Sequence, residues 1–409
     1  MKLPFKRLKL NSMPAFTSLV AGFFIFCLLG FRLASLTHGM VAELEVQNAQ
    51  IAGSGWSKLL NNPLNLPYSL PSGLVYHFTH SVFYTRLVGV FFGLVAFGLL
   101  YYILKAWHGY KIATIGLLLF GSSAAVLHVA RLIDPTVLQM LVPLSLIALG
   151  VFSHRKPHSK HSLLLWSLIF GLLLYIPGAL WLLILALVLQ LKSLSLAWQS
   201  ASKRLRIVAG LLFVAIIAPL GYYLVKQLMN HGPSGLEPWL GVSLGDINPQ
   251  NLSLLGKHYL GGLVQVPLQL FWGSGSSLAD PAKWLVGLPV LAAISDAFIA
   301  CGVLVYTQRL RDSRWRNNLL FILLGWLVIG LGGTTIYLVL PIFYLIAAAG
   351  VAYLLREWFR VFPRNPLARA LGITLILLTL TTAVLYNTRQ YFVAWANNPE
   401  TQAAFRERL

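Results

Sequence analysis

The chain has 409 residues, of which 57% are hydrophobic and 10% are charged, with 31 Lys and Arg against 11 Asp and Glu. This composition excludes an ordinary soluble domain and is typical of a polytopic membrane protein. The net charge of +20 does not indicate a nucleic-acid partner, because the basic residues form short clusters between apolar stretches. The two cysteines, Cys27 and Cys301, lie in apolar stretches and offer neither a disulfide framework nor a Cys-based metal site.

The sequence predicts an all-α fold of about eleven transmembrane helices, since a span requires about 20 apolar residues. The first, 14–36, follows a basic N-terminus, and we expect it to remain uncleaved because no clean small-residue cleavage site follows it. The fifth and sixth share one apolar run that is interrupted at Pro177 and Gly178, which suits two short helices better than one kinked helix. In chain order, the predicted spans are 14–36, 84–105, 111–130, 134–153, 162–175, 177–192, 206–226, 286–307, 317–332, 334–354 and 368–387.

The basic connectors orient these spans. Most of the 31 Lys and Arg fall in the N-terminal segment and in every second connector, which the positive-inside rule places in the cytoplasm. We therefore expect the N-terminus inside, the C-terminus outside, and one multi-pass domain over 1–409 with no soluble C-terminal domain. Two long segments face outward, 37–84 and 227–285. The second has an apolar patch too short to span, which indicates an interfacial or re-entrant helix.

The first outer segment contains two of the scarce acidic residues, Glu43 and Glu45. A carboxylate there can act as a general base or hold a divalent cation. Alternatively, the two acids simply favour the N-terminus of a surface helix. In a helix the two side chains diverge by about 200°, so only one can face a cavity beneath the loop.

A second polar group lies between the third and fourth spans, where His128, Arg131 and Asp134 precede Pro135. Arg131 can hold phosphate oxygens with two parallel hydrogen bonds. Asp134 is a functional candidate or, alternatively, a cap for the helix that follows.

Other polar residues are weaker candidates. Lys257 and His258, in the long outer segment, form a cationic pair suited to a phosphate, although interfacial lysines commonly extend only to the headgroups. Asp296 is an acid in or near the eighth span, where it is either functional or a helix cap. The chain has no phosphate-binding glycine loop and no classical zinc motif.

These residues resemble a known family. The stretch from YHFTHSVFYTRLVGV to HVARLIDPTVLQM is similar to the core of GT-C membrane glycosyltransferases, specifically the dolichyl-phosphate-mannose-protein mannosyltransferase and aminoarabinose transferase group. Arg86 stands where that group has an Arg opening the second span, and Arg131 and Asp134 match its charged turn. Tyr337 and Pro341 match its late helix. The tail after Tyr386 resembles the family's link to an outer domain.

The resemblance implies a glycosyltransferase that moves a sugar from a polyprenyl-phosphate donor to a protein, lipid or glycan acceptor at the outer face of the cell membrane. A lipid-linked donor lies in the bilayer with its phosphate at the interface. Glu43 then acts as general base, Asp134 faces it across the cavity and orients the acceptor or a divalent metal ion, and Glu45 is the alternative base. The expected contacts of the donor phosphate are Arg131, Lys257, His258 and Tyr337.

Two departures from the family keep other functions open. Ala42 stands where the family usually has a catalytic Asp, and Ile336 stands where it has an Arg. A non-catalytic relative is therefore one alternative, and a lipid or solute transporter is another. A transporter would place its polar residues near the membrane midplane in two corresponding halves. Here they gather at one face, which favours the enzyme.

Overall fold

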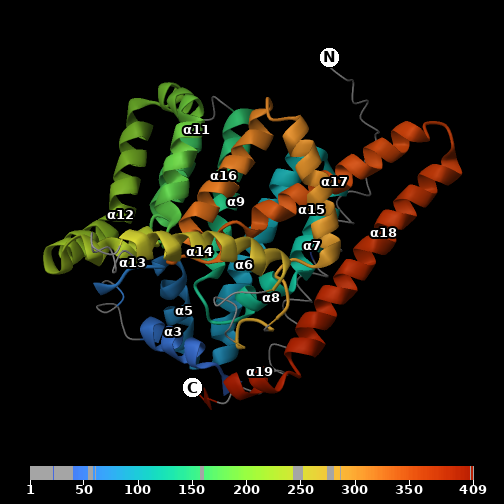
Figure 1. Ribbon diagram of the computed structural model, residues 1–409. Helices are drawn as coiled ribbons and strands as arrows, with labels where there is room; N and C mark the ends of the chain where they lie inside the picture. The colour runs from blue at the N-terminus through green and yellow to red at the C-terminus, as the bar shows by residue number, and fades with distance from the viewer. Residues whose placement is uncertain are drawn as a thin grey trace.

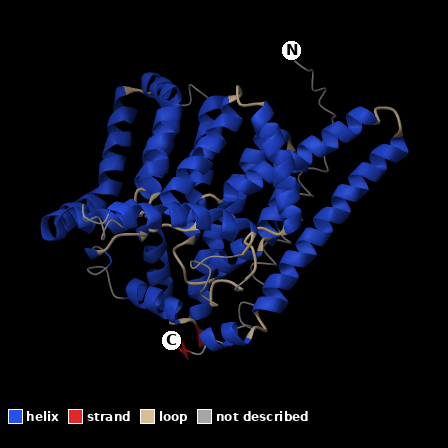
Figure 2. Ribbon diagram, in the orientation of Figure 1, coloured by secondary structure: helices blue, strands red, loops and turns tan. Residues whose placement is uncertain are grey.

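The computed structural model describes residues 22, 40–53, 59, 61–156, 161–242, 252–273, 281–285, 287–405 and 407–408. In these residues the chain is helical apart from one pair of two-residue strands (Figure 1, Figure 2). The first predicted span, 14–36, lies outside the described residues except for residue 22. The all-α expectation is confirmed for the part of the chain that the structure describes.

Each of the other ten predicted spans overlaps a helix or a bent pair of helices. In chain order these are α6 (Val82–His108), α7 (Tyr110–Ser122), α8 (Ala124–Arg131), α9 (Val137–Arg155), α10 (His161–Leu173), α11 (Ala179–Ser200), α12 (Lys203–His231), α15 (Ala293–Gln308), α16 (Ser313–Gly330), α17 (Leu340–Val361) and α18 (Pro366–Arg389). The remaining elements are β1 (Met40–Val41), α3 (Glu43–Gly53), α5 (Leu66–Thr79), η1 (Gly232–Leu236), α13 (Glu237–Leu240), α14 (Leu252–Phe271), η4 (Ile336–Leu338), the π-helical turn η5 (Gln390–Trp395), α19 (Pro399–Ala404) and β2 (Glu407–Arg408).

Six helical segments of the described chain are long and apolar enough to cross a membrane, and the bent pair α7 and α8 makes a seventh. The six contain α6, α9, α11, α12, α17 and α18. Three shorter apolar helices, which include α10 and α15, add to them. These lengths indicate a multi-pass integral membrane protein. The count of eleven spans stays a prediction.

The apolar run from 162 to 192 forms two helices, as expected. The chain leaves α10 near Leu173 and re-enters α11 at Gly178, whose φ of +74° favours a residue without a Cβ. The Gly178 N–H donates to the carbonyl of Trp239, 3.0 Å away, and a Cβ there would collide with Thr334. The break is therefore stabilised by contacts with two distant segments.

The third predicted span bends by 64° between α7 and α8. Ser123 adopts an extended conformation at the break, and α8 is fully buried over its eight residues. The apolar run 111–130 predicts one continuous span, so the bend corrects that prediction. The bend carries the end of α8, with Arg131, into the interior at one end of the bundle.

The centre of the bundle is the first half of α17, which is almost wholly buried. It packs very closely against α15, because Gly302 and Gly350 face each other's helices. A Cβ on Gly302 would collide with the backbone of Ile346, and one on Gly350 with the backbone of Phe298. Small residues at such a crossing allow two helix backbones to approach.

The helix α14 runs across the bundle at a steep angle to α11 and α16 (Figure 1). It crosses α16 where Gly262 meets Gly330, and the Trp326 Nε1 donates to the carbonyl of Leu263 at 2.7 Å. This placement fits the interfacial or re-entrant helix expected in the segment 227–285.

The two ends of the bundle differ in what covers them. The links from α11 to α12 and from α17 to α18 lie at the upper end in Figure 1, whereas α3 and α19 cover the lower end. There β1 and β2 pair antiparallel, with Met40 opposite Arg408 and Val41 opposite Glu407. The first outer segment and the last described residues thus close over the same end.

Candidate active site

Glu45 is the centre of a buried ion pair at the lower end. It is 0% exposed, and Arg86 binds it with two hydrogen bonds, Nε to Oε1 at 2.8 Å and Nη2 to Oε2 at 2.5 Å. Such a two-point contact is the strongest arrangement of this pair of side chains. The Ala42 N–H also donates to Glu45 Oε2 at 3.3 Å, which is the backward contact of a capping box at the start of α3.

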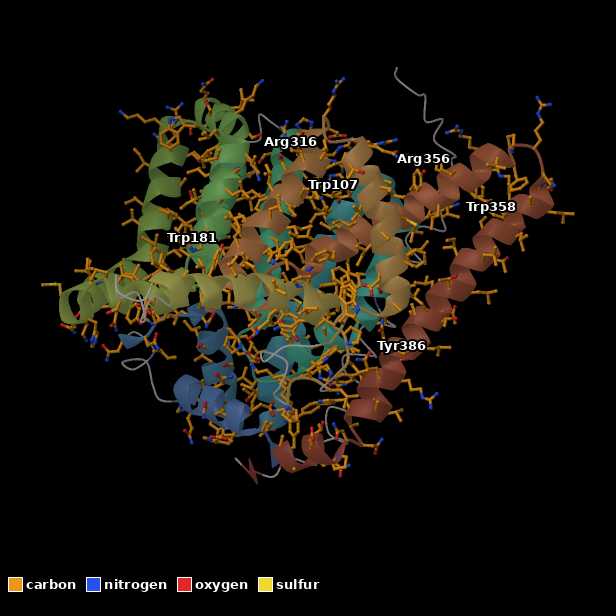
Figure 3. All side chains as sticks on the ribbon, viewed as in Figure 1. Trp107, Trp181, Arg316, Arg356, Trp358 and Tyr386 are labelled. Atoms are coloured by element: carbon orange, nitrogen blue, oxygen red, sulfur yellow. The ribbon has the colours of Figure 1, made fainter. Side chains whose placement is uncertain are left out.

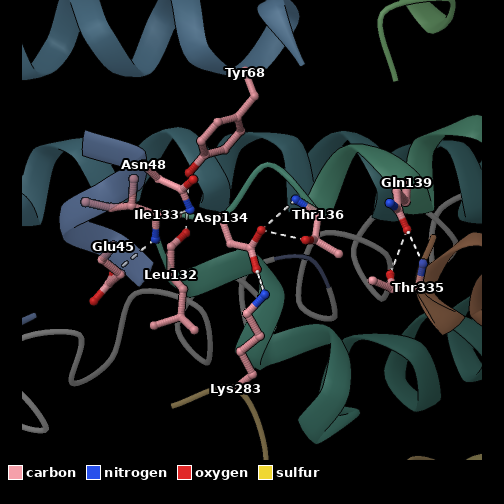
Figure 4. Close-up of polar contacts among 10 residues, drawn as sticks. All are labelled: Glu45, Asn48, Tyr68, Leu132, Ile133, Asp134, Thr136, Gln139, Lys283 and Thr335. Atoms are coloured by element: carbon pink, nitrogen blue, oxygen red, sulfur yellow. Dashed lines mark hydrogen bonds and ion pairs between the residues drawn. The ribbon is translucent and has the colours of Figure 1, made fainter. Parts of the chain in front are cut away.

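The same carboxylate reaches the turn between α8 and α9. The Ile133 N–H donates to Glu45 Oε1 at 3.0 Å (Figure 4). Arg86 can stand beside this turn because two glycines on α6 face it. A Cβ on Gly89 would lie 2.9 Å from the carbonyl oxygen of Ala130, and one on Gly93 would lie 2.9 Å from the Cβ of Ala130. Three segments far apart in sequence therefore meet at Glu45.

Two further side chains hold the carbonyls of this turn. The Asn48 Nδ2 donates to Ile133 O at 2.8 Å, and the Tyr68 hydroxyl donates to Leu132 O at 3.4 Å (Figure 4). Burial raises the pKa of Tyr68 well above its usual range, and the nearby charges of Asp134 and Glu45 raise it further. Tyr68 therefore remains protonated and able to donate.

Asp134 stabilises the turn before α9 and is part of an ion pair. Its Oδ1 accepts from the Thr136 N–H at 2.9 Å and from the Thr136 hydroxyl at 2.5 Å, which ends the turn and starts α9. Its Oδ2 lies 3.0 Å from the Nζ of Lys283 (Figure 4). The Lys283 side chain is 28% exposed. The alternative that Asp134 caps the helix is wrong, because the N-cap of α9 is Thr136 and no side chain makes a capping hydrogen bond there; Asp134 binds Thr136 in the preceding turn instead.

Arg131 and His128 are enclosed by aromatic residues near the end of the chain. The guanidinium carbon of Arg131 lies 5.1 Å from the centre of the Tyr391 ring and 5.4 Å from that of Phe392, and the residue is 1% exposed. The Arg131 Nε and Nη1 have no hydrogen-bond partner among the described residues. The cation is thus buried with rings around it and two donors unpaired.

His128 has a similar enclosure. Its ring centre lies 4.4 Å from that of Trp395 and 5.2 Å from that of Trp284, and neither ring nitrogen has a partner in the described part of the chain. Trp395 is fixed in turn, since its Nε1 donates to the carbonyl of Pro281 at 2.9 Å. The segment after α18 therefore covers both basic side chains.

The two acids of the first segment diverge. Glu43 is exposed, and its described hydrogen bond comes from the Gln47 Nε2 at 3.4 Å, whereas Glu45 points inward. The divergence follows from helix geometry. No contact within the described residues joins Glu43 to Asp134, so their expected relation across a cavity stays a prediction.

Of the other predicted phosphate contacts, the structure describes the side chain of one. Tyr337 is buried in η4, just before the start of α17. Lys257 and His258 belong to α14, but their side chains lie outside the described residues.

Sequence reasoning missed several members of this cluster. It noted Arg86 only as a motif residue, and it did not consider Lys283 or the aromatic residues after α18 as site residues. Arg86 carries a signal that could have been used, because a buried arginine in a membrane helix needs a partner and acids are scarce in this chain.

The carboxylates of the cluster do not fit a divalent cation in this arrangement. Both oxygens of Glu45 are bound by Arg86 and backbone N–H groups, and those of Asp134 by Thr136 and Lys283. In the described part of the chain, no group of three or more His, Cys, Asp or Glu residues could hold a metal ion.

Comparisons with solved structures show a likeness of fold. The similar structures are two of an oligosaccharyltransferase from Archaeoglobus fulgidus: one, named AglB, in complex with an inhibitory peptide and a dolichol-phosphate, and one in the apo form. Both give a TM-score of 0.54 at 12% identity, over 95% and 97% of this chain respectively. The chain spans 56% of the length of each. No family model and no curated protein matches the sequence.

Proposed function

We propose that the protein is a glycosyltransferase that uses a polyprenyl-phosphate sugar as donor, with its active site at the lower end of the bundle. The observation that carries this proposal is the cluster of Glu45, Arg86, Asp134 and Lys283, which gathers scarce acids and cations at one end of an apolar bundle. The GT-C-like fold supports it, since one structure of that fold is a complex with a dolichol-phosphate.

The donor phosphate would bind to cations of this end. Because the lipid phosphate leaves already charged, it needs cationic stabilisation and no proton donor. The Lys283 side chain is partly exposed. Arg131 has two donors without a partner among the described residues, and Tyr337 remains a proposed contact from η4. Lys257 and His258 remain proposed contacts from α14.

The acceptor would be activated by a carboxylate. We assign this role to Glu43, because it is exposed and Glu45 is occupied by Arg86. Glu45 then positions the start of α3 over the turn. When a donor phosphate draws Lys283 away from Asp134, the Asp134 Oδ2 becomes free to orient the acceptor. The bond between the sugar and the donor phosphate breaks and a bond forms between the sugar and the acceptor. The proton of the acceptor passes to the Glu43 carboxylate.

We also propose the finer assignments of family and topology. The motif residues Arg86, Arg131 and Tyr337 support the mannosyltransferase and aminoarabinose transferase group. The basic connectors support eleven spans with the N-terminus in the cytoplasm and the active site outside. Labelling of single cysteines at Ser159 and Ser253 tests the topology: opposite sides support it, and the same side for both contradicts it.

A second candidate is a relative that binds the donor without turnover. It is favoured by Ala42 in place of the family's Asp and by the enclosure of Arg131 under Tyr391 and Phe392. In that case the cluster would serve recognition or assembly alone.

One experiment separates these functions. The purified protein is incubated in lipid nanodiscs with a radiolabelled polyprenyl-phosphate sugar, and both bound donor and released polyprenyl phosphate are measured. An enzyme binds the donor and releases polyprenyl phosphate. A non-catalytic relative binds the donor without release. Absence of both binding and release contradicts a donor site. In a parallel assay with the protein reconstituted into sealed vesicles, movement of intact donor across the membrane would indicate the transporter.

A further inference from the structure

A cavity lies at the other end of the bundle from the Glu45 cluster. Its volume is about 520 Å³, and it is bordered by the last turns of α6 and α9, by the middle of α11 and by the first half of α16. Because α9 begins beside Asp134 and has 19 residues, the two sites are separated by roughly 28 Å. Figure 3 labels Trp107, which lines the cavity, and Arg316 near it.

One wall of this cavity carries amide groups with unpaired acceptors. The Gln190 Nε2 donates to the carbonyl of Leu146 at 3.1 Å, which fixes the amide and leaves its Oε1 without a partner among the described residues. The Asn317 Oδ1 lacks a partner as well. Buried acceptors are costly unless a donor reaches them. The wall therefore fits a ligand with hydroxyl or amine donors.

The rim of the cavity is positively charged. Asp312 is the acid among the lining residues, and it is already bound by Arg314, with an Nη2 to Oδ2 distance of 2.6 Å. Arg155 has no carboxylate partner in the described chain, and its described hydrogen bond goes from Nη2 to the carbonyl of Ala106 at 2.8 Å. The remaining donors of its guanidinium are available to an anion. His154 lines the same rim.

The remaining wall is apolar. Val151, Leu189, Phe321 and the ring of Trp107 line it. A ligand that fits the two walls and the rim has an anionic group, polar donors and an apolar part or neighbour. Tryptophan at this level is typical of the boundary between headgroups and acyl chains.

We propose that this cavity binds a phosphate ester that carries hydroxyl or amine donors. Arg155 binds the phosphate oxygens, and the Gln190 and Asn317 amides accept from the donor groups. The headgroup of an anionic phospholipid and a soluble glycerol phosphate both offer this chemistry. The proposal shares no residue with the active site proposed above, so either can fail alone.

The test measures ligand binding to the intact protein. Native mass spectrometry follows the protein released from nanodiscs of phosphatidylcholine with added phosphatidylglycerol, in the presence or absence of sn-glycerol 3-phosphate. Two variants should weaken binding in different ways: Arg155→Glu reverses the charge at the rim, and Ser193→Phe fills the cavity. Arg316→Glu makes the same charge change at an exposed residue that does not line the cavity.

We expect both site variants to lower binding by at least about tenfold, the scale of one lost charge-assisted contact. Arg316→Glu should change it by less than about twofold. Retained phosphatidylglycerol that glycerol phosphate does not displace identifies a lipid, and direct binding of glycerol phosphate identifies a soluble ligand. The proposal is overturned if neither probe binds, or if both site variants bind as well as Arg316→Glu.

Discussion

Two buried arginines at the same end of the bundle have opposite surroundings. Arg86 is 3% exposed and is bound by both oxygens of Glu45. Arg131 is 1% exposed, lies against Tyr391 and Phe392, and has no carboxylate partner in the described chain. The first pair is complete within the protein, whereas the second cation can still accept an anion.

The difference is between an ion pair that is complete within the described chain and a buried cation whose charge the described chain does not compensate. A buried charge is tolerated when hydrogen bonds and an opposite charge compensate it. Arg86 meets that condition through Glu45, and the pair fixes the first segment to the turn at Ile133. Arg131 does not meet it with the described residues alone, and aromatic rings replace only a small part of what water or an anion would supply.

The largest effect is expected from breaking the complete pair. Arg86→Met leaves the Glu45 carboxylate buried without its cation, which should lower the free energy of unfolding by about 3–5 kcal/mol. Unfolding of the detergent-solubilised protein would measure this. The double variant Arg86→Met, Glu45→Leu should recover much of the loss, because no unpaired charge remains. If Arg86→Met were as stable as the native protein, the Arg86–Glu45 pair would not stabilise the fold.

The next largest effect is expected at Arg131, the buried cation without a carboxylate partner in the described chain. Arg131→Met removes a buried charge without a carboxylate partner, so it should cost much less stability than Arg86→Met. It should nevertheless weaken binding of the polyprenyl-phosphate donor by about 1.5–3 kcal/mol, the scale of a charge-assisted contact. Arg131→Lys should restore binding only in part, since an ammonium lacks the planar fork. Native donor affinity in both variants would remove Arg131 from the site.

The smallest effect is expected at Tyr68, whose contact with the turn is long. Tyr68→Phe removes the hydroxyl that donates to Leu132 at 3.4 Å and should cost at most about 1 kcal/mol at neutral pH. Burial raises the pKa of Tyr68 above the usual 10.0 in the folded protein. Its contribution to stability is therefore complete below about pH 10 and is lost as the pH rises further.

The pH dependence supplies the control for this variant. Between about pH 8 and pH 11, the native protein should lose more stability than Tyr68→Phe, because only the native protein has a phenol that must stay protonated. Equal losses of stability in both proteins would show that the buried Tyr68 hydroxyl does not contribute to the stability of the folded protein.

The sequence predicted the helices better than the site. Apolar length placed ten helical segments, and the Pro177–Gly178 break was found because proline and glycine mark it. The bend at Ser123 was missed, since it depends on how α8 packs and not on a local signal. The divergence of Glu43 and Glu45 followed from local helix geometry, whereas α9 begins at Thr136 rather than with a cap from Asp134.

The long-range contacts could not be predicted in this way. Glu45 and Arg86 are 41 residues apart, and one sequence contains no information on which acid meets which cation. Lys283 lies in an irregular segment without a periodic pattern. The aromatic residues Tyr391 and Trp395 were interpreted as a link toward another domain, whereas they pack on His128 and Arg131.

We propose that the Glu43 carboxylate, at the lower end of the bundle, acts as the general base in sugar transfer, and the variant Glu43→Gln tests this most directly. Glu400→Gln is the matched control, because Glu400 is also exposed and begins α19 at the same end. Release of polyprenyl phosphate from a radiolabelled donor is measured with donor binding in each protein. We expect Glu43→Gln to bind the donor normally and to turn over about 100-fold more slowly, and Glu400→Gln to match the native protein. Native turnover by Glu43→Gln would contradict the account.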